Sequence, residues 1–161
     1  MPSVAKQAIP PVLRTRMGEQ FCRENQGGVL MLQHCSECHA VQYPPRERCR
    51  TCLADSLVWR ETNNTGAVLS VTQLHHSQGE FFQKKINDRP WPVATILLAH
   101  QCLMVHLASA TFSGDVVAGS ELKVFTAKDT SGRPVLIGVS ADTDISEIDQ
   151  RNAISKDMGL T

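Results

Sequence analysis

Two pairs of cysteines constrain the fold of this chain more than any other feature. Cys35 and Cys38 form one C-x-x-C pair, and Cys49 and Cys52 form a second pair after an intervening loop of ten residues. Each pair can direct two sulfurs toward one point, and a hairpin between the pairs completes the tetrahedron of thiolates that zinc prefers. The spacing therefore predicts one structural zinc ion, bound by these four cysteines, with no open position for a catalytic water.

Three other roles for the cysteines are weaker. Disulfides belong mainly to exported proteins. The segment from Met1 to Pro11 is interrupted by prolines and has no apolar signal-peptide core, so we expect a cytoplasmic protein. An iron centre would accept the same ligands and is the competing metal. A redox C-x-x-C usually starts a helix and needs no second pair, so the pattern favours a metal.

Composition limits the classes of function. The chain has 161 residues, enough for one domain or two small ones. Sixteen basic residues balance sixteen acidic ones, and aromatic residues make up 5%, which argues against a protein that works mainly on nucleic acid. No apolar run approaches the ~20 residues that a membrane helix needs, so no membrane partner is expected.

The pattern of apolar segments and turns predicts a mainly β fold. An N-terminal helix and a zinc ribbon precede a five-stranded OB-like barrel, with a sandwich fragment as the competing fold. The strands of the barrel are expected at 67–74, 92–99, 102–109, 121–126 and 135–141. The predicted parts are an N-terminal arm and helix (1–28), the ribbon (29–62), the barrel domain (63–142) and a C-terminal tail (143–161). The tail is polar, and we expect it to have too little core to be ordered alone.

The order of the motifs resembles a known family. A short helix precedes the first cysteine pair, Tyr43-Pro44-Pro45-Arg46 lies between the pairs, and Trp59 and a turn containing Gly66 lead into the barrel. This order is similar to that of proteins with a rubredoxin-like zinc ribbon followed by an acyl-CoA-associated OB fold, over residues 15–142. Many such relatives have Gly after the second cysteine, where this chain has His39. A positive φ is therefore expected there, which His tolerates better than a β-branched residue.

The resemblance implies a non-catalytic subunit in a hetero-oligomer. Members of the family accompany larger thiolase-like catalytic subunits and complete or stabilise their site for a CoA ester. The expected partner is a thiolase-type enzyme, and the alternatives are an aldolase, an enoyl-CoA hydratase or hydroxymethylglutaryl-CoA synthase. A nucleic-acid-binding module is a further alternative from another class, since zinc ribbons and OB folds also serve there.

One segment has the composition expected of a CoA contact. Between Phe81 and Arg89 the chain combines two phenylalanines with three cations, Lys84, Lys85 and Arg89. Aromatic rings can stack on adenine, and cations can pair with phosphates. The competing interpretation is a solvated loop whose aromatic side chains point inward.

No catalytic residue is predicted. Cys102 alternates with apolar residues near His100 and His106, but three such positions on a straight strand cannot meet at one atom. A self-contained enzyme that uses Cys102 is therefore disfavoured, and this side of the strand is expected to face a partner or solvent. Cys22 is expected to be inert. Adjacent His75 and His76 would point to opposite faces of a strand, so they are not expected to bind one ion.

Overall fold

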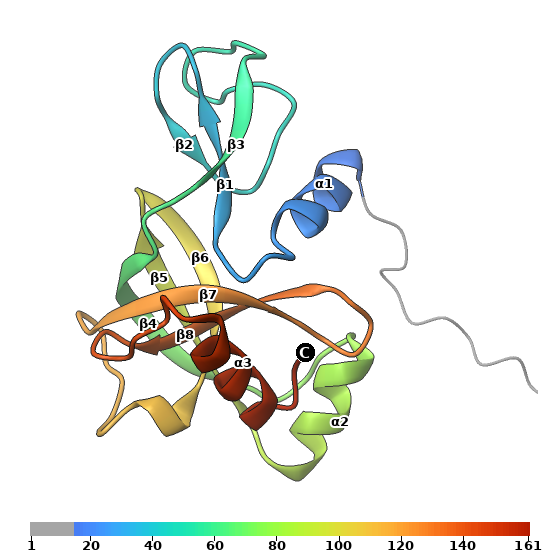
Figure 1. Cartoon of the computed structure of the whole chain (residues 1–161), viewed down its shortest axis with the longest axis vertical. Helices are drawn as coiled ribbons and strands as arrows, with labels where there is room; N and C mark the ends of the chain where they lie inside the picture. The colour runs from blue at the N-terminus through green and yellow to red at the C-terminus, as the bar shows by residue number, and fades with distance from the viewer. Residues whose placement is uncertain (1–14) are drawn as a thin grey trace, which may run out of the picture.

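A computed structural model describes residues 15–161, and it consists of a small sheet above a barrel (Figure 1). The small sheet has the strand order β2-β1-β3, and the closed barrel has the order β4-β5-β6-β8-β7. In chain order the elements are α1 (Arg16–Glu24), β1 (Met31–Cys35), β2 (Val41–Gln42), β3 (Leu57–Glu61), β4 (Thr65–Leu74), α2 (Glu80–Asp88), β5 (Trp91–Leu98), β6 (Gln101–Leu107), η1 (Ser109–Thr111), β7 (Glu121–Lys128), β8 (Pro134–Ser140) and α3 (Ile148–Asp157). The predicted fold, a helix and a ribbon before a five-stranded barrel, is confirmed. The arm that is predicted to precede this helix, within residues 1–28, lies outside the described part up to residue 14.

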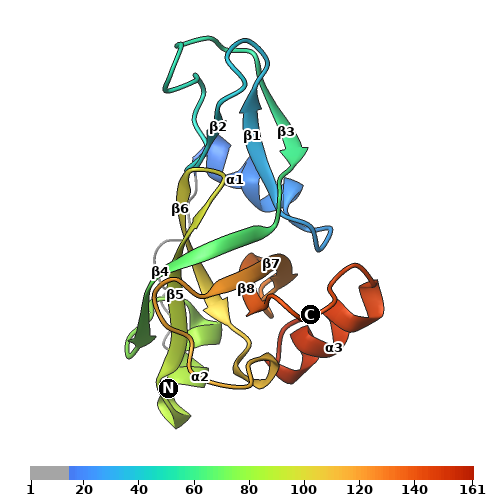
Figure 2. The same cartoon turned by 90° about the vertical axis from the view of Figure 1, so that its left-hand side faces the viewer.

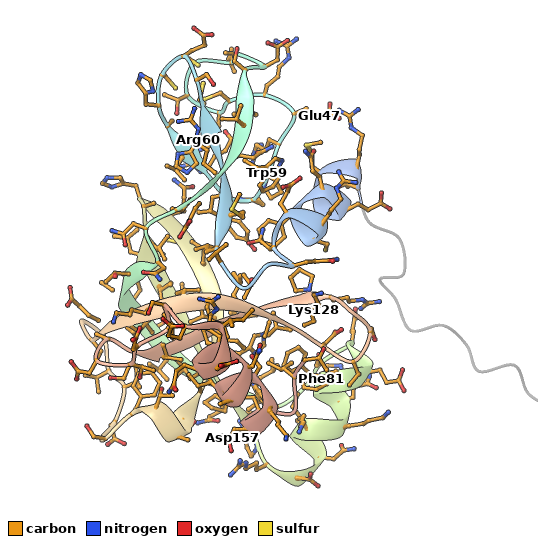
Figure 3. All side chains as sticks on the ribbon, viewed as in Figure 1. Glu47, Trp59, Arg60, Phe81, Lys128 and Asp157 are labelled. Carbon is orange, nitrogen blue, oxygen red and sulfur yellow. The ribbon has the colours of Figure 1, made fainter. Side chains whose placement is uncertain are left out.

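Helix α1 is attached to the ribbon at both ends. The Thr15 side chain accepts a hydrogen bond from the Gly18 N–H and caps the helix start. At the other end, the fully buried Asn25 accepts from the Met31 N–H at 2.9 Å and donates to the Met31 carbonyl at 3.0 Å. The Phe21 ring lies 6.1 Å from the ring of Trp59, which Figure 3 labels on the ribbon. These contacts fix the helix against β1 and β3.

The ribbon and the barrel share a hydrophobic core. Leu30 and Leu32, at the base of the ribbon, are buried in one cluster with barrel residues such as Ile96 and Leu103. A second link is polar, because the buried Gln101 at the start of β6 accepts a hydrogen bond from the Tyr43 N–H at 3.2 Å. The aromatic-Pro-Pro-Arg motif therefore lies at the junction of the two parts, next to the barrel.

The C-terminal tail corrects one expectation. Residues 148–157 form α3, which packs on the barrel, as the two views show (Figures 1 and 2). Ile154 and Met158, one helical turn apart, are buried in a core cluster that also contains Phe81 and Trp91. Gly159, at φ 74°, ends the helix, and the Leu160 N–H donates back to the Ser155 carbonyl at 2.8 Å. The tail therefore contributes to the core, and the expectation that it had too little core was wrong.

The segment between β4 and β5 is a helix rather than a loop. Helix α2 packs on the barrel, where Phe81, labelled in Figure 3, is buried in a cluster with Trp91 and Ile137. Phe82 stacks on His106 with ring centroids 4.3 Å apart. The aromatic side chains thus point inward, as the competing interpretation supposed. In the described residues, no helix is both long and apolar enough to cross a membrane.

Candidate metal centre

The two cysteine pairs form two knuckles with the same backbone geometry. In the first knuckle, the His39 N–H donates to the Cys35 carbonyl at 3.0 Å, and His39 has φ 60°. In the second, the Leu53 N–H donates to the Cys49 carbonyl at 3.0 Å, and Leu53 has φ 64°. The expected positive φ at His39 is confirmed. Leu53 takes the same conformation, which was not foreseen because the residue type gives no signal for it.

The knuckles bring the four thiols to one point. All four sulfur atoms lie within 4.8 Å of one another, and the Cys35–Cys52 and Cys38–Cys49 Sγ pairs are each 3.6 Å apart. Zinc–sulfur bonds of ~2.3 Å in a tetrahedron require sulfurs about 3.8 Å apart. The sulfur positions therefore fit one zinc ion with four thiolate ligands. Such a site has no free coordination position for a water or a substrate.

The protonation of the thiols is uneven. The backbone N–H groups of Cys52 and Thr51 lower the pKa of Cys49 to about 6. The backbone near Ala54 lowers the pKa of Cys52, but desolvation and the neighbouring thiols outweigh this effect and raise the pKa to about 12. Four adjacent sulfurs can all be thiolates only if a cation compensates their charge.

Two buried glutamines, which were missed from the sequence, hold the loop between the knuckles. Gln33 accepts from the Arg46 N–H at 2.8 Å and donates to the Arg46 carbonyl at 3.0 Å. Gln42 accepts from the Arg50 N–H at 3.1 Å and donates to the Gln33 side chain at 3.0 Å. Both side chains are almost completely buried. A glutamine within a short apolar strand is the sequence signal that could have indicated them. A buried side-chain amide usually forms hydrogen bonds, here with backbone groups.

The three cations predicted to contact CoA do not all lie at one place in the structure. Lys85 and Arg89 line an open cleft of about 540 Å³ between α2 and the end of α3, together with Asp88 and Asp157. Lys84 is not among the residues that line this cleft, and its Nζ forms an ion pair with Glu80 at 3.1 Å. Lys85 also lies over the Phe81 ring, 5.7 Å from its centroid. The structure therefore brings two of the three predicted residues to one cleft.

Cys102 and His106 lie in different environments. Cys102 is exposed on the outer face of β6, whereas His106 is buried beneath Phe82. Burial lowers the pKa of His106 to about 4, and its Nδ1 has no hydrogen-bond partner among the residues described. His106 therefore offers no accessible base to Cys102. His75 and His76 are exposed after β4 and belong to none of the potential metal clusters in residues 15–161.

Comparisons with known proteins match both parts of the chain. Residues 28–58 match the family described as ChsH2, rubredoxin-like zinc ribbon domain. A chain of the solved Ltp2-ChsH2(DUF35) aldolase aligns with a TM-score of 0.64 and 20% identity, covering 81% of this chain and 98% of that one. A protein of unknown function from the DUF35 family of Sulfolobus solfataricus aligns less well, with a TM-score of 0.44, 20% identity and coverage of 68% and 77%. No curated protein matches the chain.

The matches agree with the resemblance noted from the motifs. The family model covers both cysteine knuckles and the strands between and beside them. The aligned structure extends the likeness through the barrel, at the level of fold. Residues 28–58 are therefore similar to the ChsH2 rubredoxin-like zinc ribbon domain, and the chain shares its overall fold with a chain of the Ltp2-ChsH2(DUF35) aldolase.

Proposed function

We propose that Cys35, Cys38, Cys49 and Cys52 bind one zinc ion whose role is structural. The observation that carries this proposal is the convergence of four sulfurs at tetrahedral spacing within a zinc-ribbon match. When bound, the ion supplies folding energy to a ribbon too small to form a core of its own. With all four ligands provided by the protein, the ion does no chemistry.

We further propose that the chain is a non-catalytic subunit of a larger acyl-CoA enzyme of the thiolase type. The fold is shared with a chain of a solved Ltp2-ChsH2(DUF35) aldolase, whose name describes an assembly of two proteins. The metal site is closed, and His106, which is buried beneath Phe82, is not available as a base to the exposed Cys102. A chain with these features is better suited to support another subunit than to act alone.

The second part of this proposal concerns which kind of acyl-CoA enzyme the chain accompanies. The motif order favours a thiolase partner, and the small subunit of 2-benzoylsuccinyl-CoA thiolase is one specific candidate. The shared fold equally supports an aldolase partner, since the neighbour in that fold is an aldolase. A nucleic-acid module is less favoured, because the chain has equal numbers of acidic and basic residues.

Within such a complex, Lys85 and Arg89 are proposed to contact the phosphates of the CoA ester. Both residues line the same cleft, where the buried Trp91 also lies. Lys85 lies in the last turn of α2 and Arg89 follows the helix in extended backbone, so two cations from one segment line the cleft and can pair with phosphate groups.

The test is steady-state kinetics on the complex of this chain with the thiolase-type subunit from the same organism. The chain alone should not turn over CoA esters. Lys85→Ala and Arg89→Ala should each raise the apparent KM by about tenfold, because a lost charge-assisted hydrogen bond costs about 1–3 kcal/mol. Lys84→Ala is the matched control and should leave KM unchanged.

Cys102→Ser should leave kcat of the complex largely intact. A loss of kcat by orders of magnitude, with normal assembly, would identify Cys102 as a nucleophile and overturn the non-catalytic role. Equal KM values for Lys85→Ala, Arg89→Ala and Lys84→Ala would remove the CoA contact from this cleft.

A further inference from the structure

An apolar surface lies exposed on one side of the barrel. The described residues include seven large hydrophobic side chains that are exposed, and five of them gather on or beside β4, β5 and β6. Leu97 and Met104 lie on the outer face of β5 and β6, Leu69 lies at the bulge of β4, and Val117 lies in the turn whose Gly119 N–H donates to the Val68 carbonyl. Val71 pairs with the buried Ala94, so its side chain is on the other side of the sheet and is exposed at the free end of β4. Scattered apolar residues need no explanation, but a concentration of this kind marks an interaction site.

Strand register shows that part of this surface is one continuous face. Residues opposite each other in paired strands point to the same side of a sheet. Leu97 pairs with Ala67 and with Cys102, and all three are exposed. The next row joins Ser70, Thr95 and Met104. In the third row Val93 and His106 are buried, Thr72 is exposed at the free edge, and Phe82 of α2 stacks on His106. Helix α2 therefore bounds the open face at one end.

The second half of β4 adds an open strand edge to this face. Strand β4 pairs with β7 from Thr65 to Ala67, and Val68 continues this edge through backbone hydrogen bonds with Gly119 and Ser120. A bulge against β5 follows between Val68 and Ser70. Beyond the bulge, residues 69–73 are all exposed, and in the described part of the chain they pair with β5 alone. This edge contains no proline and no charge, which are the usual features that prevent a free edge from pairing.

Charge determines which partner the surface fits. The strands β4, β5 and β6 contain no Asp, Glu, Lys or Arg, although the whole chain has sixteen acidic and sixteen basic residues. A charged partner surface would lose its hydration here without gaining an opposite charge. The complementary surface is therefore uncharged and apolar, as at the centre of stable protein interfaces.

A second copy of the chain covers this surface poorly. If two β4 edges paired, the sheets would continue side by side, and Leu97 and Met104 would stay exposed on the outer face. If two outer faces stacked, the free edge of β4 would stay unpaired. A partner that follows the edge and also overlaps the face satisfies both the backbone groups and the apolar side chains.

We infer that this surface receives an uncharged, extended segment of the larger acyl-CoA enzyme subunit, which adds a strand to β4 and covers Leu97 and Met104. This inference rests on the proposed accessory role and locates its interface. Main-chain hydrogen bonds along residues 69–74 would provide affinity, and the apolar rows on β5 and β6 would provide specificity.

The experiment compares dissociation constants of the complex, measured by calorimetry with the thiolase-type subunit from the same organism. Leu97→Lys and Met104→Lys should weaken binding by about 30-fold or more, because each places an unpaired charge in an apolar contact. Leu53→Lys and Ile148→Lys are matched controls, since these two residues are exposed apolar side chains on the ribbon and on α3. Both controls should bind like the unaltered chain, and zinc content and circular dichroism verify that all four variants fold.

The possible outcomes separate the interface from the accessory role. If the unaltered chain binds and all four variants bind equally well, the interface lies elsewhere and the accessory role stands. If only the control variants lose binding, the interface is on the ribbon or α3. If the unaltered chain binds no such subunit, both proposals fail. If the chain instead dimerises by light scattering and Leu97→Lys makes it monomeric, the surface belongs to a second copy and the inference is overturned.

Discussion

Cys49→Ser should release the zinc and unfold the ribbon. Cys49 is completely buried, and its sulfur accepts a hydrogen bond from the Thr51 N–H at 3.4 Å. Structural zinc in small peptides contributes an apparent ~10–16 kcal/mol, which equals or exceeds the whole stability of a typical domain. Metal analysis should find zinc lost, and amide NMR signals from residues 29–62 should collapse toward random-coil positions.

Cys22→Ser is the matched control for this change. Cys22 lies on α1 and is not part of the four-sulfur cluster, so its replacement should keep the zinc and the ribbon signals. A Cys49→Ser protein with an intact ribbon would show that metal ligation does not hold this part of the fold.

Ile154→Ala should destabilise the protein by about 2–5 kcal/mol. Ile154 is 8% exposed and packs in the cluster that contains Phe81, Trp91 and Ile137. Its truncation therefore leaves a cavity between α3 and the barrel. Chemical denaturation should show this loss in the free energy of unfolding, and the melting temperature should fall by roughly 2–4 °C per kcal/mol.

The same helix offers the control, because Ile148 is 60% exposed. Ile148→Ala should change the free energy of unfolding by no more than about 0.5 kcal/mol. Equal effects of the two changes would mean that α3 does not pack on the barrel through Ile154.

The ribbon was predictable because local spacing determines it. The two C-x-x-C pairs and the loop of ten residues between them are short-range patterns, and the four sulfurs converge as that spacing predicts. The barrel was predictable for a similar reason, since its strands are apolar segments separated by turns. Strand ends moved by one to two residues where pairing extended them, as at Thr65 and Lys128.

The tail and α2 were harder to predict because their order depends on distant residues. Ile154 and Met158 are isolated apolar residues in a polar segment. They are buried because they pack against the cluster that contains Phe81 and Trp91, which is distant in the sequence. Likewise, α2 is held by Phe82 on His106, a contact between segments that no local pattern connects. The separation of Lys84 from Lys85 follows from the helical geometry of α2, and Arg89 reaches the cleft from the extended residue after the helix; a predicted loop could specify neither.

Native mass spectrometry of this chain mixed with the thiolase-type subunit from the same organism tests the central claim most directly. This measurement gives the mass of the intact assembly, and with it both the subunit stoichiometry and the mass of any bound metal. The account predicts a hetero-oligomer in which each copy of this chain carries one zinc ion, as the four-sulfur site requires. A folded chain that stays monomeric beside that subunit, or that carries iron or no metal, would contradict it.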